Sequence, residues 1–480
     1  METNFSHQTF ISPFSWRYGS EEMRSIWSEH RKRTLLRRVW IALAKAQCKA
    51  GLVSQAQVDD LYAHKDDIDI PRSLEIEKTI RHDLMAEIKT YAEQCPIGGS
   101  IIHLGATSMD ALDNMDVIRQ KEALAIILKH VKAVAESFIE KIVAFSDTPC
   151  MAFTHIQPAE ITTVGYRLAQ TAQDLLQDIT NLTTIYSSLR GKGMKGAVGS
   201  SASYTVLLQG SGMDAREMER LVMDELDLGA FEAATQVYPR KQDWQLGAAL
   251  AGLAQTLYKF AIDVRLLQSP AIGEWSEPFG EKQVGSSAMP FKRNPIESEK
   301  IDSLCRFVVS QCDVLWQNAA HSFLERTLDD SANRRVVLPE MFMAIEEALM
   351  CTSHIVSQMR IHRAQIERNL KIWGVFASSE RLLMELGRKG ADRQHMHEVI
   401  RQHSLVAWDA VQQGKDNPLI EMLSHDAEIL EYLDVQQILL SMHTEDYVGD
   451  APQRARRVSQ MLQESIKHIL STIPQNNLRR

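Results

Sequence analysis

The residues best suited to chemistry lie in one short segment, residues 285–295, which reads GSSAMPFKRNP. It places Ser286, Ser287, Lys292 and Asn294 between a glycine and a proline, with a second proline in the middle. Two prolines and a glycine exclude a continuous helix or a central strand, so the segment is expected to be a loop. A hydroxyl, a cation and backbone N–H groups suit the binding and deprotonation of a substrate that carries carboxylates. An ordinary connecting loop is the alternative, and the order of the residues favours the functional interpretation.

Other short polar segments carry arginine, histidine and hydroxyl side chains. They are Arg17-Tyr18, Arg81-His82-Asp83, residues 103–108 (HLGATS), residues 154–159 (THIQPA) and residues 325–335 (ERTLDDSANRR). Charged runs are usually solvated helix faces, but arginine also binds phosphate and carboxylate groups through paired hydrogen bonds. His155 is expected in a polar turn that leads into a helix at Pro158, and histidine donates protons readily near neutral pH. A structural histidine is the alternative.

The order of residues in 285–295 resembles the signature loop of the fumarase/aspartase superfamily, whose members split a C–N or C–O bond and release fumarate. The other segments resemble the adenylosuccinate lyase branch and occur in that family's order along the chain. The resemblance covers most of the chain and is weaker towards the C-terminus. It implies elimination of fumarate from adenylosuccinate, giving AMP, and from SAICAR, giving AICAR, in purine nucleotide biosynthesis.

The resemblance also implies roles for individual side chains. Ser286 is expected to remove the carbon-bound proton, ionised with the help of Lys292 and backbone N–H groups as the loop closes over the substrate. His155 is expected to protonate the departing nitrogen, and Glu299 to orient its ring, although Glu297 is the other candidate for that partner. The expected ligands of the succinyl part are Thr107, Ser108, Thr154, Gln236, Lys292 and Asn294. Those of the nucleotide are Arg17, Tyr18, Arg81, His82, Asp83, Arg326, Ser331 and Arg335.

Two positions depart from the family pattern. Phe291 stands where many relatives carry histidine or tyrosine, so a polar contact is lost there. Thr235 precedes Gln236 where glycine is more usual, which leaves the role of Gln236 less certain. Two other functions stay open: another fumarate-releasing enzyme such as argininosuccinate lyase, and a non-catalytic structural paralogue. The phosphate-type arginine segments disfavour the first, and the presence of Ser286, Lys292 and His155 disfavours the second.

Two further motifs are weaker. Residues 191–196 fit the GxGxxG pattern of dinucleotide-binding loops, but a helix rather than a strand is expected before them. A helix end is therefore the favoured interpretation, with Lys192 and Lys195 left as possible substrate contacts. His395 and His397 are two residues apart, so on a helix their rings diverge and a metal site is disfavoured. The family resemblance implies neither a metal nor an organic cofactor.

Helical periodicity predicts the elements that position these residues. Apolar residues recur at spacings of four and three from Leu246 to Leu267 and from Leu124 to Phe145, as in long bundled helices. Further helices are expected from Pro158 to about Leu189 and from Pro339 to about Met359. We expect an all-α fold of three helical domains, at residues 1–108, 109–361 and 362–480. The resemblance implies a homotetramer with shared active sites, each built from three subunits.

Composition sets the remaining expectations. The chain of 480 residues has a net charge of −9, which disfavours nucleic acid as a partner. Its six cysteines form no CxxC pair, so free thiols in a reducing compartment are expected. No long apolar run and no signal peptide are evident, so no membrane association is expected and the cytoplasm is the predicted location.

Overall fold

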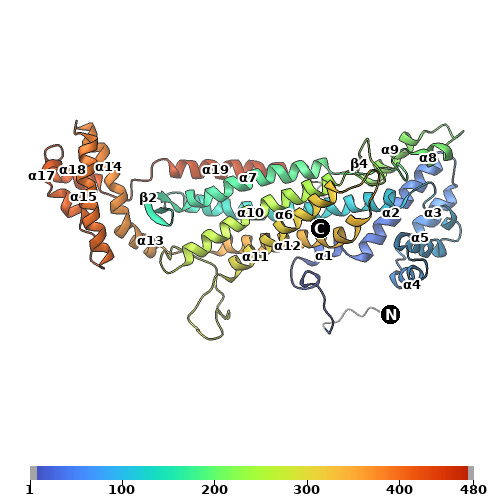
Figure 1. The fold of residues 1–480 in the computed structure, drawn as a ribbon, viewed down its shortest axis with the longest axis horizontal. Coiled ribbons are helices and arrows are strands. Elements are labelled where there is room, and N and C mark those ends of the chain that lie inside the picture. The colour runs from blue at the N-terminus through green and yellow to red at the C-terminus, as the bar shows by residue number, and fades with distance from the viewer. Residues whose placement is uncertain (1–7, 474–480) are drawn as a thin grey trace.

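The computed structural model describes residues 8–473, and helices dominate them. Figure 1 shows an elongated molecule in which a bundle of long helices joins a small helical domain at each end. The strands form three two-stranded pairs within the described residues. The all-α prediction is therefore confirmed, and the bundle is the part that positions the candidate site.

The central bundle contains the long helices. They are α6 (Ser108–Ala144), α7 (Val164–Ser188), α10 (Lys241–Gln268), α11 (Ile296–Ala320), α12 (Asp329–Gln358) and α19 (Ala451–Thr472). Both predicted apolar stripes face its interior: the α10 stripe from Leu246 to Leu267 is buried throughout, and Phe138 of α6 packs edge-on against Phe260 with ring centroids 5.1 Å apart. Burial of these stripes, rather than helix propensity, stabilises helices of this length.

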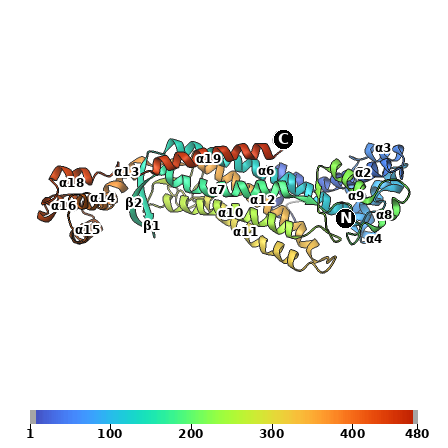
Figure 2. The ribbon, with the colours of Figure 1, turned by 90° about the horizontal axis from the view of Figure 1, so that it is seen from above.

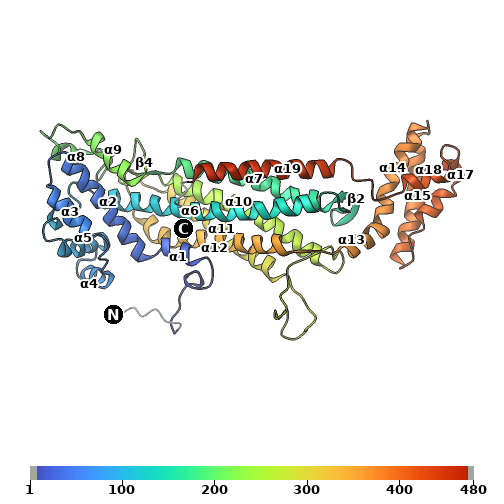
Figure 3. The ribbon, with the colours of Figure 1, turned by 180° about the vertical axis from the view of Figure 1, so that it is seen from behind.

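The N-terminal end is made of α1 (Glu21–Ile26), α2 (Glu29–Lys49), α3 (Gln55–Ala63), α4 (Ile70–Ile80) and α5 (Asp83–Gln94). Two short helices from the middle of the chain, α8 (Ala202–Leu207) and α9 (Ala215–Leu226), lie at the same end, and α9 packs on α2 (Figure 3).

The other end holds α13 (Arg363–Asn369), α14 (Val375–Arg388), α15 (Arg393–Gln412), α16 (Leu419–Ser424), α17 (Ala427–Leu430) and α18 (Val435–Ser441). Helices α14–α18 share a hydrophobic core of their own, whereas Ile366 of α13 packs in the main core. Helix α19 then returns along α7 and α6, as Figure 2 shows. The domain limits at residues 108 and 361 remain predictions.

Two predicted helix starts are wrong. Residues Gln157–Thr163 form strand β2, which pairs antiparallel with β1 (Pro149–Thr154), and helix α7 begins only at Val164. The β-branched residues before Val164 favour a strand once β1 is beside them. The helix expected from Pro339 begins ten residues earlier, at Asp329, and runs through the proline. The buried side chains around Pro339 outweigh the backbone hydrogen bond that it lacks.

The glycine-rich segment 191–196 is organised by a buried carboxylate. Asp110 accepts hydrogen bonds from Lys192, from the Tyr204 hydroxyl (3.0 Å) and from the backbone N–H of Gly196. Lys195 pairs with Glu219 at 2.6 Å. The preceding strand β3 (Arg190–Gly191) has only two residues and pairs with the equally short β4 (Gly229–Ala230). Both lysines thus have structural partners, and no dinucleotide-binding sheet precedes the segment.

The remaining sequence motifs are structural in the described part of the chain. All six cysteines are free. His395 pairs with Glu428 and not with His397, and residues 8–473 contain no group of three side chains placed to hold a metal. Within the same residues, no helix combines the length and apolar character that a membrane crossing requires.

Asp178 gives a stability prediction. It is buried between α7 and α10, where the Thr256 hydroxyl donates to it at 2.7 Å, and burial raises the pKa of Asp178 to about 6. Because an unfolded aspartate titrates near pH 4, the stability contributed by the protonated native form is present below about pH 4 and lost as the pH rises to about 6. We expect Asp178→Asn to raise the free energy of unfolding by about 1–3 kcal/mol above pH 6.

Urea unfolding at pH 4 and pH 7.5 measures this difference. Asp409→Asn, an exposed position on α15, is the control and should change stability little at either pH. An equal effect of Asp178→Asn at both pH values would contradict the assignment.

Candidate active site

The signature loop lies between strand β5 (Trp275–Ser276) and helix α11. Within it the Ser286 Oγ accepts hydrogen bonds from the backbone N–H groups of Ala288 (3.3 Å) and Met289 (3.1 Å). Both donors belong to the turn that Ser286 begins, and N–H groups in such positions stabilise negative charge on an oxygen. The Lys292 side chain is exposed and has no hydrogen-bond partner among residues 8–473. Asn294 braces the loop by donating to the Gly285 carbonyl at 3.1 Å.

His155 lies at the tip of the β1–β2 hairpin and not at a helix entrance. The two-residue turn consists of His155 and Ile156, which have φ angles of 54° and 61°, and Thr154 pairs with Gln157 below it. This left-handed conformation is rare for a β-branched residue and costs about 1–2 kcal/mol at each position. The imidazole is exposed and has no hydrogen-bond partner in the described part of the chain. It is therefore free to meet a group from outside this chain.

Three of the predicted nucleotide ligands line a common cavity. Arg326, Ser331 and Arg335 border a space of about 100 Å³ between α2, α6 and the first turns of α12. Asp83 reaches the same place, with its Oδ2 2.9 Å from the Arg335 Nη2 and 3.8 Å from the Lys32 Nζ. Burial raises the pKa of Asp83, but Lys32 and other donors outweigh it and hold the pKa below its usual value. Five cationic and two acidic side chains line this cavity, and each of the five cations already faces a carboxylate of the same chain.

Five further predicted ligands lie on turns and helix ends that are exposed or partly buried. Arg81 ends α4 in a left-handed conformation, and His82 begins α5 by accepting from the Met85 N–H at 3.3 Å. Thr107 precedes α6, and Ser108 is its first residue. Gln236 donates its backbone N–H to the Glu325 carbonyl at 3.1 Å, which places it next to the segment that begins α12. These positions surround the cavity end of the bundle.

Arg17 and Tyr18 lie farther along the bundle. The Arg17 guanidinium stands 6.0 Å from the centre of the Tyr18 ring, and the following residues are tied to the middle of α12. The Gly19 N–H donates to Glu347 at 3.2 Å, and Ser20 donates to Glu346. Sixteen residues of α12 separate Ser331 from Glu347, a rise of about 24 Å along the helix.

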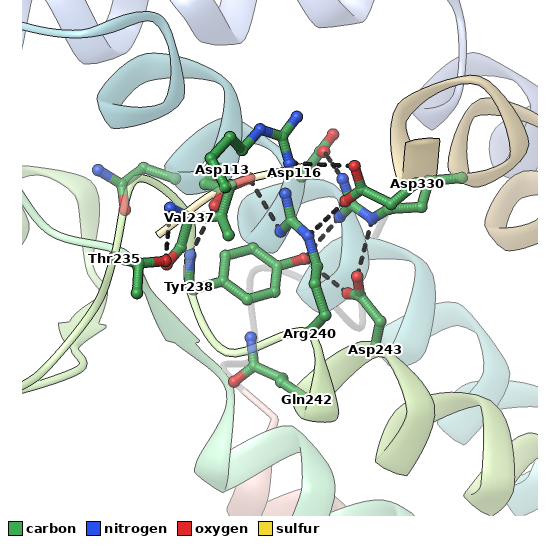
Figure 4. A network of polar contacts seen from close by, with 12 residues as sticks. Asp113, Asp116, Thr235, Val237, Tyr238, Arg240, Gln242, Asp243 and Asp330 are labelled. Carbon is green, nitrogen blue, oxygen red and sulfur yellow. Dashed lines mark hydrogen bonds and ion pairs between the residues drawn. The ribbon is translucent and has the colours of Figure 1, made fainter. Parts of the chain in front are cut away.

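Sequence reasoning missed a buried charge network next to the cavity (Figure 4). Its four carboxylates and four guanidiniums balance in charge. They belong to Asp113, Asp116, Asp243 and Asp330 and to Arg119, Arg240, Arg326 and Arg334. The Arg240 guanidinium bridges Asp330 (2.7 Å) and Asp113 (3.0 Å). The Tyr238 hydroxyl donates to Asp243 at 2.6 Å and accepts from Arg334 at 2.8 Å. The network joins α6, α10 and α12 to the turn before α10.

One signal in the sequence could have revealed this network. Arg334 and Arg335 are adjacent on α12, and neighbouring residues of a helix point about 100° apart. Both side chains border the cavity, but they differ in burial. Arg335 is exposed and pairs with Asp83, whereas Arg334 turns inward to Asp243.

A single chain does not bring the predicted site residues together. Helix α6 has 37 residues, so Thr107 before it and the base of the β1–β2 hairpin after it are about 55 Å apart. Glu297, just after the signature loop, hydrogen bonds to His354 at 2.8 Å, and His354 is about 35 Å along α12 from Ser331. Figure 1 shows the hairpin near the C-terminal domain and the N-terminal helices at the opposite end.

The predicted acid–carboxylate pair is also apart in one chain. The Glu299 Oε1 is 4.0 Å from the Arg265 Nη2, and Glu297 is occupied by His354. Neither carboxylate contacts His155 within residues 8–473. The choice between Glu297 and Glu299 therefore stays a prediction, although Glu299 is the more exposed of the two.

Comparisons with known proteins point to one family. The family model described as Lyase matches residues 18–310, and the model described as Adenylosuccinate lyase C-terminus matches residues 376–458. The chain is 37% identical to an adenylosuccinate lyase of Schistosoma mansoni, covering 87% of this chain and 88% of that protein. It is 36% identical to an adenylosuccinate lyase of Pyrococcus abyssi, covering 95% and 98%.

Solved structures agree at the level of the fold. A 3-carboxy-cis,cis-muconate lactonizing enzyme from Pseudomonas putida superposes with a TM-score of 0.82 at 23% identity, covering 94% of this chain and 99% of that one. A fumarate lyase from Mesorhizobium superposes with a TM-score of 0.81 at 20% identity, covering 92% and 98%. The long-helix bundle with two helical ends is thus shared with these enzymes.

The charge network predicts a large loss of stability when one member is removed. Arg240→Met leaves Asp113 and Asp330 buried without their common partner, and we expect the free energy of unfolding to fall by about 3–5 kcal/mol. Urea unfolding measures this. The control is Arg216→Met, because Arg216 and Glu232 form an ion pair in which both side chains are 84% exposed, and its loss should cost less than about 1 kcal/mol. Equal losses in the two variants would contradict the structural role of the network.

Proposed function

The chain belongs to the adenylosuccinate lyase family, and we propose that it eliminates fumarate from adenylosuccinate, giving AMP, with Ser286 as base and His155 as acid. The observation that carries this proposal is the Ser286 hydroxyl, held under two backbone N–H donors in the loop that also carries Lys292. The same elimination applied to SAICAR, which carries the same succinyl-amine group, gives AICAR.

Proton removal is the difficult step. The proton leaves a carbon next to a carboxylate, and a dianionic aci-carboxylate develops. Ser286 takes this proton as an alkoxide that the N–H groups of Ala288 and Met289 stabilise. Lys292, which is free of other partners in the described residues, and Asn294 hold carboxylate oxygens of the substrate where the charge grows. Closure of the exposed loop excludes water and strengthens these interactions.

His155 completes the reaction by protonating the amine that leaves. Its place on the tip of a hairpin lets the ring enter a cleft of a neighbouring molecule, where Glu299 in the first turn of α11 orients and charges it. Thr107, Ser108, Thr154 and Gln236 bind the succinyl part. The nucleotide phosphate binds among Arg326, Ser331 and Arg335, with Arg81, His82 and Asp83 around it. Arg17 and Tyr18 lie about 24 Å away in the same chain, so another copy supplies them to this site. The cationic side chains that line the 100 Å³ cavity support the assignment of the phosphate.

Separation of these groups along one chain supports shared active sites in a homotetramer. Residues that are about 35–55 Å apart in one molecule meet only if different copies contribute them. Large apolar side chains are also exposed on α11, on α12 and on the connection between them, as expected for helices that pack against other copies. They are Val309, Trp316, Phe323, Leu328 and Val336.

Argininosuccinate lyase activity is the second candidate function. Its substrate carries no phosphate group for the arginines of the cavity to bind. Purified protein mixed with each substrate, and followed by ultraviolet absorbance, separates the two functions. A non-catalytic paralogue would turn over neither substrate, and the retained Ser286, Lys292 and His155 disfavour it.

Two substitutions test the assigned chemistry. We expect Ser286→Ala and His155→Ala each to lower kcat on adenylosuccinate at least about a hundredfold, the scale of general acid–base contributions. Ser287→Ala, next to the proposed base, is the matched control and should keep kcat within about tenfold of the wild type. Near-normal turnover in either of the first two variants would remove that residue from the mechanism.

Mixing the two inactive variants tests whether sites are shared. If a site takes Ser286 from one copy and His155 from another, random exchange of equal amounts of Ser286→Ala and His155→Ala restores both groups in about a quarter of the sites. The measurement is fumarate release after the mixture has been dissociated and reassembled. Activity that stays at the level of the separate variants would mean that one chain supplies both groups.

A further inference from the structure

The base of the signature loop contains a buried carboxylate that the proposed chemistry does not use. Helix α11 follows the loop, and its first N–H groups need acceptors because no preceding turn supplies them. The residue in the capping position is Pro295, which has no side-chain acceptor and makes no capping hydrogen bond. The acceptor comes from Glu277, at the other end of the loop.

Glu277 spans the two stems of the loop. Its Oε1 accepts from the Ser298 N–H at 2.6 Å, and its Oε2 accepts from the Glu297 N–H at 3.2 Å. The negative charge also faces the positive end of the α11 dipole. Glu297 and Ser298 directly precede Glu299 in the first turn of α11. The Glu277 carboxylate therefore fixes the turn that carries Glu299, the predicted partner of His155.

Gln268, the last residue of α10, holds the same stems from the other side. Its amide oxygen accepts from the Glu277 N–H at 2.9 Å, and its amide nitrogen donates to the Arg293 carbonyl at 3.0 Å. Glu277 and Gln268 together define what we term the neck clamp. The loop that carries Ser286, Lys292 and Asn294 lies between Glu277 and the first turn of α11. The clamp attaches this loop to the bundle.

Burial of the Glu277 carboxylate in the clamp costs free energy. Glu277 is 6% exposed, and burial raises its pKa above the ordinary value although donors from residues 297 and 298 lower it. A serine, threonine or aspartate at position 295 would cap α11 more cheaply. Such a local cap would not connect the two stems. The distant carboxylate therefore does something for the loop that capping alone does not require.

We propose that Glu277 is a positioning residue: it ties the two stems of the signature loop together, so that Ser286, Lys292 and Asn294 reach the substrate in one fixed arrangement. The positioning of catalysis rests on the proposed function, whereas the restraint on the loop does not. Loss of the clamp lets the stems separate, and the base then samples many positions relative to the substrate. Small misplacements of a catalytic group lower the rate far more than they lower substrate affinity.

The experiment uses the full chain and the variants Glu277→Gln and Glu277→Ala. The glutamine keeps the shape but removes the charge and places an NH₂ against a helix N–H, and the alanine removes both acceptors. Asp392→Asn is the matched control, because Asp392 accepts from two N–H groups, Gln394 (2.8 Å) and His395 (3.0 Å), at the start of α15. All variants are compared at a temperature at which circular dichroism shows them folded.

Two readouts are measured: the rate of trypsin cleavage after Lys292 and Arg293, and kcat and KM for fumarate release. For Glu277→Gln we expect cleavage about tenfold faster, kcat about tenfold lower and KM within about threefold of the wild type. Glu277→Ala should exceed these effects, and Asp392→Asn should change neither readout by more than about twofold. A merely structural role would lower the melting temperature without this split between kcat and KM.

The outcomes separate the clamp from the proposed function. Wild-type cleavage rates in folded Glu277→Gln, or equal acceleration by Asp392→Asn, overturn the clamp. A lower kcat without faster cleavage overturns it as well, because Glu277 would then act on something other than loop order. If the wild type releases no fumarate but the Glu277 variants are cleaved faster, the clamp stands and the proposed function fails. If Glu277→Ala does not fold, Glu277→Gln alone decides.

Discussion

The buried ion network around Tyr238 is the interaction on which the rest of the structure depends. Its charges cancel. The carboxylates of α6 and α10 are tolerated in the interior because arginines of α12 and of the turn before α10 form ion pairs with them. Removing a partner leaves a charge that the protein interior cannot solvate. The network thereby fixes how three long helices and one turn meet. The cavity with Arg326, Ser331 and Arg335 is built on that fixed junction.

The candidate site divides its tasks between two kinds of element. Most groups expected to bind the nucleotide lie at helix ends next to the rigid junction, and Arg17 and Tyr18 lie farther along the bundle. Groups expected to move protons lie on projections: Ser286 on a loop and His155 on a hairpin tip with a strained turn. A loop or a hairpin tip of this kind can reach a neighbouring chain, where the rigid helix ends that are expected to bind the nucleotide form the other side of the site. This division is consistent with an enzyme whose active site is completed by association.

The sequence predicted the helices well where the cause is local, and poorly where it is distant. The stripe from Leu246 to Leu267 identifies a long buried helix without further information, because its period matches the helix itself. Residues 158–163 belong to strand β2 and not to the predicted helix, and their strand partner, β1, is not visible in a local pattern. The loop 285–295 could be singled out from its residue types, but the clamp at Glu277 could not, since it depends on a contact across twenty residues. The convergence of Ser286 with His155 is beyond what one chain can reveal.

Helix α19 has a consequence for the C-terminal domain. Because this helix returns to lie along α6 and α7, helices α13–α18 are an insertion in the bundle rather than an appendage to it. The backbone leaves the bundle after α12 and re-enters it before α19, so two connecting segments join the domain to the bundle. Helices α13 and α14 also contact strands β1 and β2. The C-terminal domain therefore braces the hairpin that carries His155.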